Sequence, residues 1–252
     1  MNIKIALQLY TLKQYCQDID SLRTTLAKVK QIGYNAVQID NIGVTDPNNI
    51  IKAVREADLT ICATHENPAD FYDTPMQVIE RLKTLECNHT AIPKAGTFKL
   101  TSTKEILEYC KKLNTIGKLF YDNGITLSYH NHDAEFSLHD GKRTIDIILD
   151  NTDSKYLKLE LDTFWVHAGG CNIVDYIKKV EGRMPLIHLK DWIVTPERER
   201  QFGEVGYGNL DWNRIIPAAY YAGCEWYIVE QDKTQRDPFE SVEMSYNFLK
   251  KY

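Results

Sequence analysis

Short apolar runs alternate with longer amphipathic stretches along the whole chain. Each short run is rich in aliphatic and β-branched residues and is bounded by polar or glycine-containing segments, which predicts a buried β-strand. The predicted strands are Ile3–Leu9, Ala36–Ile39, Leu59–Thr64, Thr90–Pro93, Ile125–His130, Leu157–Asp162, Leu186–Lys190 and Trp226–Glu230.

The stretches between the strands repeat their apolar positions with the period of an α-helix. Leu22, Leu26 and Val29 fall on one stripe in this way. The predicted helices are Ile19–Ile32, Pro47–Ala57, Pro75–Leu85, Thr103–Asn123, Arg143–Asn151, Ile173–Glu181, Trp212–Ala222 and Pro238–Lys250. Three of them are followed by a glycine suited to a left-handed helix end, namely Gly33, Gly124 and Gly223.

Eight strands that alternate with eight helices favour an all-parallel sheet. Eight such units in 252 residues match a closed (β/α)8 TIM barrel better than an open sheet. No G-x-G-x-x-G motif follows the first strand, which weakens a dinucleotide-binding interpretation. Because we find no linker, low-complexity tract or shift in composition, we expect residues 1–252 to form a single barrel domain.

The composition narrows the classes of partner. The chain carries 35 acidic and 30 basic residues, whereas a protein that binds nucleic acid usually has a basic face. No apolar run approaches the roughly 18 residues of a transmembrane helix, and the six cysteines include no C-x-x-C pair. We therefore expect a soluble, cytoplasmic protein with mostly buried free thiols, and neither nucleic acid nor membrane as a partner.

Metal ligands and acid–base groups stand at the ends of successive predicted strands. His65 follows the third strand, and His130, Asp162 and Glu230 end the fifth, sixth and eighth, while His188 lies within the seventh. In a barrel these ends meet at the C-terminal mouth, where active sites form. Because burying so many charged groups together is costly, we expect a divalent cation to compensate them. Mixed imidazole and carboxylate ligands suit manganese, cobalt, zinc or iron(II), and magnesium remains an alternative.

Strand alternation helps to select the residues that face the barrel interior. Ser128 shares one face of its strand with His130, and Glu160 shares one face of its strand with Asp162. We expect these faces to point inward, with His130 and Asp162 at the rim.

At these residues the chain resembles the xylose isomerase-like TIM barrels of the sugar phosphate isomerase/epimerase superfamily. The resemblance is carried by YHNHDAEF (129–136), LDTFWVHAGG (161–170), HLKD (188–191), VGYGNLDW (205–212) and VEQD (229–232). It implies one divalent metal ion, with Asp162, His188 and Glu230 among its ligands. The family's usual glutamate on the fifth strand falls on His130 here. Either His130 takes its place as a ligand, which we favour, or Glu135 reaches in from the following loop.

The expected chemistry is proton abstraction next to a carbonyl, with the metal stabilising the enediolate. Glu135 and Glu230 are the candidate carboxylate bases, with His132 as another candidate. Lys190 is expected to bind a substrate oxygen or to stabilise negative charge. Its structural alternative is an ion pair with Asp162 or Asp191.

Three further residues are candidates for contact with the substrate. His65 is one, with a structural role as the alternative. Trp165 would pack against a sugar face, and its alternative is packing at the barrel rim. His167 would orient a metal ligand or contact the substrate, although it also fits the start of a helix because Gly169 and Gly170 follow it.

These residues favour a metal-dependent sugar isomerase or epimerase. The YHNHD-x-EF variant also resembles members that act as lyases or dehydratases on 3-keto sugars and inosose-like polyols, so that reaction stays open. A non-catalytic sugar-binding barrel and a DNA-repair endonuclease with several metal ions are weaker alternatives. The expected ligand is a small sugar or keto-sugar without a phosphate group, since no Gly-rich phosphate cradle is present. A homo-oligomer is possible.

Overall fold

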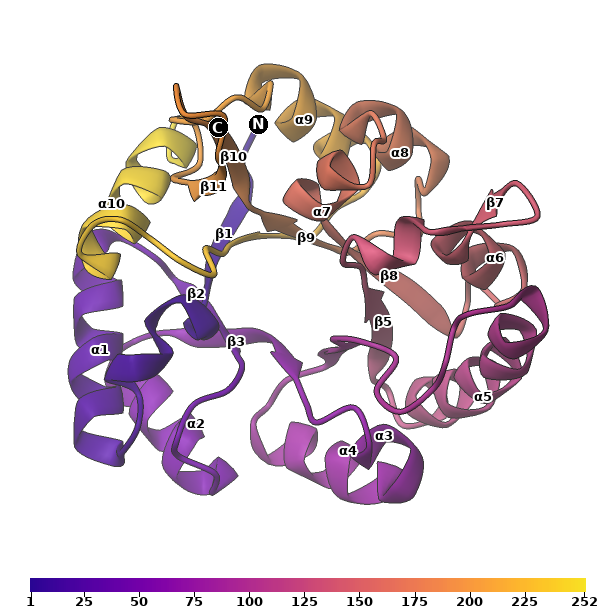
Figure 1. The fold of residues 1–252 in the computed structure, drawn as a ribbon. Helices are drawn as coiled ribbons and strands as arrows, with labels where there is room; N and C mark the ends of the chain where they lie inside the picture. The colour runs from indigo at the N-terminus through magenta and orange to yellow at the C-terminus, as the bar shows by residue number, and fades with distance from the viewer.

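The eight predicted strands close into one parallel barrel in the computed structural model, which describes residues 1–252. Around the barrel the strand order is β1-β12-β9-β8-β5-β4-β3-β2, and the helices surround it (Figure 1). The TIM-barrel prediction is therefore confirmed. The strands are β1 (Lys4–Gln8), β2 (Ala36–Ile39), β3 (Thr60–His65), β4 (His89–Ile92), β5 (Thr126–His130), β8 (Leu157–Asp162), β9 (Leu186–Leu189) and β12 (Trp226–Val229).

The long helices also lie where their apolar periodicity predicts them. They are α1 (Ile19–Ile32), α2 (Pro47–Glu56), α4 (Pro75–Thr84), α5 (Thr103–Asp122), α6 (Thr144–Asp150), α8 (Ile173–Lys179), α9 (Trp212–Tyr221) and α10 (Pro238–Leu249). Gly33, Gly124 and Gly223 have φ angles of 124°, 75° and 84°, so glycine relieves the backbone strain that a side chain would cause after these helices.

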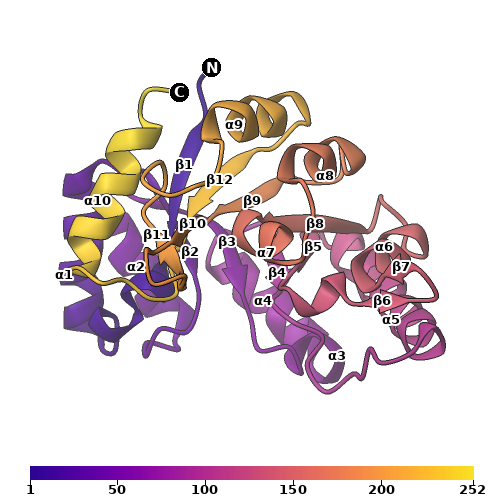
Figure 2. The ribbon, with the colours of Figure 1, turned by 45° about the horizontal axis from the view of Figure 1, so that its top comes forward.

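Several short elements were not predicted, and all of them lie in connections between the barrel strands and the long helices. They are η1 (Leu9–Tyr15), α3 (Asp70–Asp73), η2 (Ala134–Phe136), α7 (Thr163–Ala168), the hairpin of β6 (Leu138–His139) and β7 (Lys142–Arg143), and the hairpin of β10 (Asp191–Val194) and β11 (Arg200–Gly203). The β10–β11 hairpin, labelled in Figure 2, forms a two-stranded sheet of its own.

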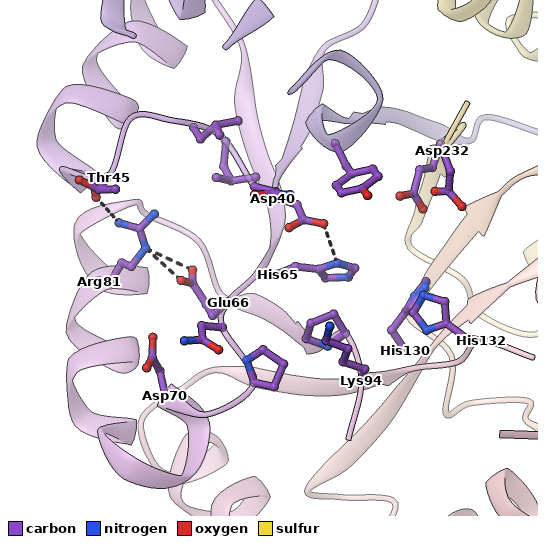
Figure 3. Close-up of a pocket in the computed structure, with 18 of the residues that line it drawn as sticks. Asp40, Thr45, His65, Glu66, Asp70, Arg81, Lys94, His130, His132 and Asp232 are labelled. Atoms are coloured by element: carbon purple, nitrogen blue, oxygen red, sulfur yellow. Dashed lines mark hydrogen bonds and ion pairs between the residues drawn. The ribbon is translucent and has the colours of Figure 1, made fainter. Parts of the chain in front are cut away.

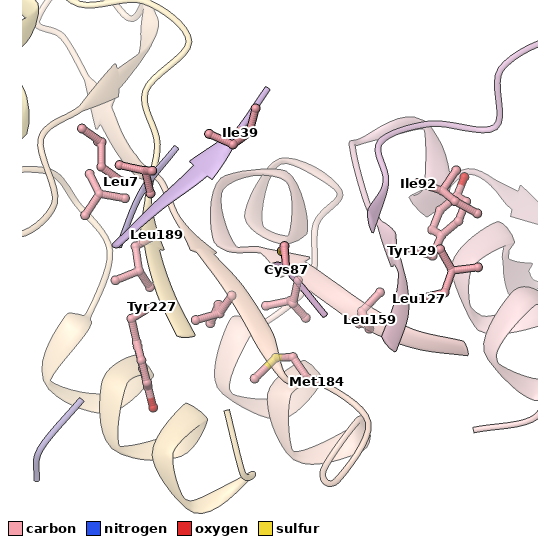
Figure 4. Close-up of a cluster of buried hydrophobic side chains, with 14 of the residues drawn as sticks. Leu7, Ile39, Cys87, Ile92, Leu127, Tyr129, Leu159, Met184, Leu189 and Tyr227 are labelled. Atoms are coloured by element: carbon pink, nitrogen blue, oxygen red, sulfur yellow. The ribbon is translucent and has the colours of Figure 1, made fainter. Parts of the chain in front are cut away.

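The two faces of each barrel strand carry different chemistry. The outward faces pack against the helices and contribute residues such as Leu127, Tyr129 and Leu159 to the main apolar core (Figure 4). Inside the barrel, a small apolar cluster includes Ala36 and Ala63. Toward the carboxyl ends of the strands the buried residues become polar, and this change places the candidate site at the C-terminal mouth.

All six cysteines are free, and four of them are buried, as the sequence predicts. No helix of the chain is long and apolar enough to cross a membrane.

The β10–β11 hairpin and the loop that follows it are held by Asp191, a fully buried residue. Its carboxylate accepts hydrogen bonds from the backbone N–H groups of Gly206 and Gly208, both at 3.0 Å. It also accepts from the indole N–H of Trp212, the first residue of α9, at 2.5 Å. A side chain at Gly208 would collide with this carboxylate. Because Lys190 directly precedes Asp191, the same contacts fix the backbone beside the site.

We expect Asp191→Ala to lower the free energy of unfolding by about 3–5 kcal/mol, because several buried N–H groups lose a charged acceptor. Asp191→Asn should lose less, since its amide oxygen still accepts. Urea denaturation measures both. A loss for Asp191→Ala no larger than that of the exposed control Asp150→Ala would contradict this account of the loop.

Candidate metal and sugar site

Polar side chains from four neighbouring strands meet at the C-terminal mouth of the barrel. His130 from β5, Asp162 from β8, His188 from β9 and Glu230, which follows β12, are all buried. Strand register aligns them, because His130 pairs with Glu160 and Asp162 pairs with His188. The structure therefore brings together the four residues that the sequence assigned to a metal.

Below this rim, Glu160 is fully buried among three histidine rings. Its Oε2 lies 2.5 Å from His65 Nε2 and 3.0 Å from His130 Nδ1. Its Oε1 lies 3.3 Å from His188 Nε2 and accepts a hydrogen bond from Gln38 Nε2 at 2.7 Å. Glu160 is thus the centre of an inner network that links β2, β3, β5, β8 and β9.

The second nitrogen of each ring faces a different carboxylate. His65 Nδ1 lies 3.2 Å from Asp40 Oδ2, and His188 Nδ1 lies 2.6 Å from Glu230 Oε2. His130 Nε2 lies 3.9 Å from Asp162 Oδ2, which is too far for a hydrogen bond. Carboxylates in such positions fix the tautomer and orientation of an imidazole ligand.

Lys190 supplies a positive charge to the outer carboxylates. Its Nζ lies 3.1 Å from Asp162 Oδ2, 2.9 Å from Glu230 Oε2 and 3.1 Å from Asp232 Oδ1. Of the two structural alternatives for Lys190, the structure shows the ion pair with Asp162. The neighbouring Asp191 instead binds the loop described above.

The electrostatics divide the histidines into two kinds. Burial lowers the pKa of His130 well below its usual value and that of His132 to about 4, so both rings are neutral at pH 7. Burial opposes the charged form of His188 as well, but Glu160 and Glu230 raise the pKa of His188 to about 9. Burial likewise disfavours a charged Glu160, yet His188 and His65 hold its pKa well below the ordinary range.

The residues present fit a divalent metal ion in two overlapping ways. One donor set is Asp162, His188 and Glu230, and the other is His65, His130, Glu160 and His188, with the donor atoms of each set within 4.8 Å of one another. Two buried donor atoms, Asp162 Oδ2 and His130 Nδ1, make no hydrogen bond of good geometry and have the contacts with Lys190 and Glu160 given above. Mixed imidazole and carboxylate donors suit manganese, iron(II), cobalt or zinc. His130 and Glu230 line the open cavity, whereas Glu160 does not.

Glu135 lies apart from this cluster. It is buried in η2, where it accepts hydrogen bonds from the Tyr129 hydroxyl at 2.9 Å and from the backbone N–H of His132 at 2.8 Å. The Tyr129 ring belongs to the outward face of β5, opposite to His130. The structure therefore places His130, and not Glu135, among the candidate ligands, and Glu135 does not line the cavity.

The remaining predicted residues have different places. His132 lines the cavity, and its ring centre lies 5.6 Å from that of Trp165. Lys190 Nζ lies over the Trp165 ring, 5.7 Å from the ring centre. The indole N–H of Trp165 is buried without a hydrogen-bond partner. His167 is exposed and packs against Trp192. The structure does not bring His167 to the cluster. It lies two residues after Trp165 on α7, and side chains two positions apart on a helix point to different sides.

A cavity of about 770 Å³ opens at the mouth and extends over the N-terminal half of the barrel. His65, which was predicted to contact substrate, lines it (Figure 3). The sequence prediction assigned no role to Asp40 and Asp232, although Asp40 directly follows β2 and Asp232 stands three residues after β12. Arg81 on α4 carries no such signal. The lining residues that were not assigned include Tyr10, Asp40, Glu66, Arg81, Lys94 and Asp232.

Comparisons with known proteins agree with this geometry. The sequence model of the xylose isomerase-like TIM barrel family matches residues 26–252. An inosose dehydratase from Salmonella typhimurium is 26% identical over 155 residues, which cover 52% of this chain and 48% of that protein. The chain spans about half the length of the curated relatives it matches.

Two solved structures share the fold over nearly the whole chain. A sugar phosphate isomerase/epimerase from Parabacteroides distasonis superposes with a TM-score of 0.83 at 23% identity, covering 99% of this chain and 94% of that one. An L-ribulose 3-epimerase superposes with a TM-score of 0.73 at 16% identity, with the same coverage.

We expect the protein to bind one Mn²⁺ per chain, measured by calorimetry and by elemental analysis after dialysis. Asp162→Asn should weaken binding more than 100-fold if its carboxylate is a ligand. Glu160→Gln should weaken it about 10-fold to 100-fold, as expected for a group that orients the ligands. Glu135→Gln is the matched control and should retain the metal. The reverse order, with Glu160→Gln losing more than Asp162→Asn, would place the ion in the inner donor set.

Proposed function

We propose that this chain, which belongs to the xylose isomerase-like TIM barrel family, is a divalent-metal-dependent enzyme. Its proposed reaction is the isomerisation or epimerisation of a small sugar or keto-sugar. One observation carries the proposal: the buried imidazole and carboxylate cluster reaches an open cavity through His65, His130 and Glu230, and Lys190 and His132 line the same cavity. A metal-dependent enzyme that moves a proton next to a carbonyl uses a metal site and a base, and a nearby cation stabilises the developing negative charge.

The proposed ligands are His130, Asp162, His188 and Glu230. Both donor sets have members that line the cavity, so a substrate oxygen could reach an ion in either. This set of four is preferred because the oxygens of Glu160, the carboxylate of the inner set, already contact Gln38 and His65. Manganese is the proposed metal, with magnesium, cobalt, zinc and iron(II) as alternatives. When bound, such an ion would polarise the substrate carbonyl and stabilise negative charge on its oxygen.

The proton is proposed to go to His132. Its ring lines the cavity beside His130, with ring centres 4.9 Å apart, and a neutral imidazole can accept a proton from carbon. Glu230 also lines the cavity and is the alternative base. Glu135, which binds the backbone N–H of His132, is proposed to position His132 and not to touch the substrate.

Lys190 and Trp165 are proposed to bind substrate oxygens. The Lys190 ammonium can stabilise the negative charge that develops next to the abstracted proton. The buried indole N–H of Trp165 has no partner within the chain, so a substrate oxygen would satisfy it. His65 would contact the substrate from the opposite wall, since it lines the cavity from β3.

A dehydratase is the second candidate function, and the sequence matches to inosose dehydratases favour it. Both reactions begin with the same loss of a proton next to a carbonyl. An epimerase returns a proton to the same carbon from the other face, whereas a dehydratase expels a hydroxyl group from the neighbouring carbon and needs an acid there. Lys190 is the candidate acid on the cavity wall.

Proton exchange tests the proposal directly. With Mn²⁺ and a panel of keto-sugars and inososes in D₂O, the protein should replace the hydrogen next to the carbonyl by deuterium, as followed by NMR. His132→Ala should slow exchange by about 10²–10⁴-fold, the usual contribution of a general base, while metal binding persists. An epimerised product or an unsaturated product in the same spectra separates the two candidate reactions.

Glu135→Gln tests the positioning role. It should slow exchange less than His132→Ala does and should alter kcat more than KM, because the base is displaced while the substrate contacts remain. Asp150→Asn on the protein surface is the control. A protein that binds these sugars but exchanges no proton would be a sugar-binding barrel, and the enzyme proposal would then be wrong.

A further inference from the structure

The cavity extends beyond the side chains proposed to act on the substrate. His130, His132 and Asp232 lie at one side in Figure 3, and Glu66, Asp70 and Arg81 lie at the other, with His65 between them. The volume of about 770 Å³ lies in the upper part of the roughly 300–1,000 Å³ found for pockets that enclose drug-sized ligands. A single small sugar bound at the catalytic cluster would leave the far side empty.

The far side has a built framework. Arg81 donates from Nε to both oxygens of Glu66, at 3.3 and 3.1 Å, and from Nη1 to the backbone carbonyl of Thr45 at 2.6 Å. These bonds tie the start of the loop after β3 to α4 and to the segment before α2. Its other terminal nitrogen, Nη2, makes no hydrogen bond within the chain. We call the group Thr45, Glu66, Asn67, Asp70 and Arg81 the distal lobe.

The distal lobe offers donors and acceptors side by side. The Nδ2 group of Asn67 and Nη2 of Arg81 are free donors, and the Asp70 carboxylate makes no side-chain hydrogen bond and is a free acceptor. Hydroxyl groups both donate and accept, so a sugar ring can use all three. A phosphate group can only accept at pH 7, and Asp70 and Glu66 would repel it.

The charge balance supports the same choice. The distal lobe holds two carboxylates, Glu66 and Asp70, against one cation, Arg81, so its formal charge is −1. Sites for phosphate groups instead gather cations and backbone N–H groups without carboxylates.

We propose that the distal lobe is a binding subsite for the second, uncharged unit of a two-unit sugar substrate, such as a glycoside or disaccharide whose keto-sugar unit lies at the catalytic cluster. The proposal rests on the proposed function for the position of the reacting unit. In this proposal, the loops after β2 and β3 select for the length of the substrate. The side chains at the ends of β5, β8, β9 and β12 carry out the reaction.

Asn67 gives the sharpest test, because its side chain is exposed and its loss leaves no buried charge unpaired. Calorimetry with the Mn²⁺-loaded protein compares a 3-keto disaccharide, the corresponding 3-keto monosaccharide and a phosphorylated monosaccharide. The disaccharide should bind at least 10-fold more tightly than either other sugar. Asn67→Ala should reduce this advantage about fivefold, as expected for one lost neutral hydrogen bond. Asn49→Ala, an exposed asparagine on α2 outside the cavity, should leave the ratio unchanged.

Equal binding of the disaccharide and the monosaccharide, tighter binding of the phosphorylated sugar, or the same ratio in Asn67→Ala and wild type would each overturn the subsite. Proton exchange in D₂O, measured on the same sugars, reports separately on the proposed function. Preferential binding of the disaccharide without exchange would support the subsite and contradict the enzyme. Proton exchange with the monosaccharide, without tighter binding of the disaccharide, would support the enzyme proposal and contradict the subsite.

Discussion

A fully buried glutamate at the mouth of the barrel, Glu160, sets the constraint on which the candidate site depends. An ionised carboxylate without contact to water is stable only if nearby groups compensate its charge. Here Gln38 and three histidine rings supply that compensation from four other strands. One nitrogen of each ring faces Glu160, and the other nitrogen faces a different carboxylate. The inner network therefore orients the groups that face the cavity.

The closed barrel holds these side chains in place without any need to order flexible loops. Parallel register places His130 beside Glu160 and Asp162 beside His188, so the backbone, and not flexible loops, sets their spacing. The outward faces of the same strands are apolar and packed against helices. The core thus fixes the strands from outside while their inner faces carry charged side chains. Asp191 fixes the loop near Lys190 as well, through its hydrogen bonds to the backbone N–H groups of Gly206 and Gly208.

The parts of this structure that follow from local periodicity could be predicted from the sequence. Strands, long helices and the inward faces of β5 and β8 depend on patterns along one segment. Glu160 was seen to share a face with Asp162, but its role could not be predicted, because its partners Gln38 and His65 come from distant strands. His89 lies just outside the predicted strand Thr90–Pro93, and no local pattern marks it as buried, yet it is buried at the start of β4.

The cavity wall was predicted least well, for a related physical reason. The resemblance lies mainly in the second half of the chain, where the side chains proposed to act on the substrate stand at strand ends. The first half contributes loops and one helix, and a basic residue such as Arg81 on an amphipathic helix ordinarily faces water. Only the fold shows that Arg81 turns to Glu66 and Thr45 and lines the cavity.

Lys190 connects the ion pairs at the barrel mouth to the proposed reaction. Its ammonium lies between Asp162 and Glu230, two of the proposed metal ligands, and also contacts Asp232, which is not one of them. Lys190 and the protonated His188 balance the charge of these buried carboxylates. A divalent ion held by Asp162 and Glu230 would repel the ammonium, and Asp232 is the acceptor that would retain it at the cavity wall. The ammonium would then face the substrate oxygen, which is the position that the proposed chemistry requires of Lys190.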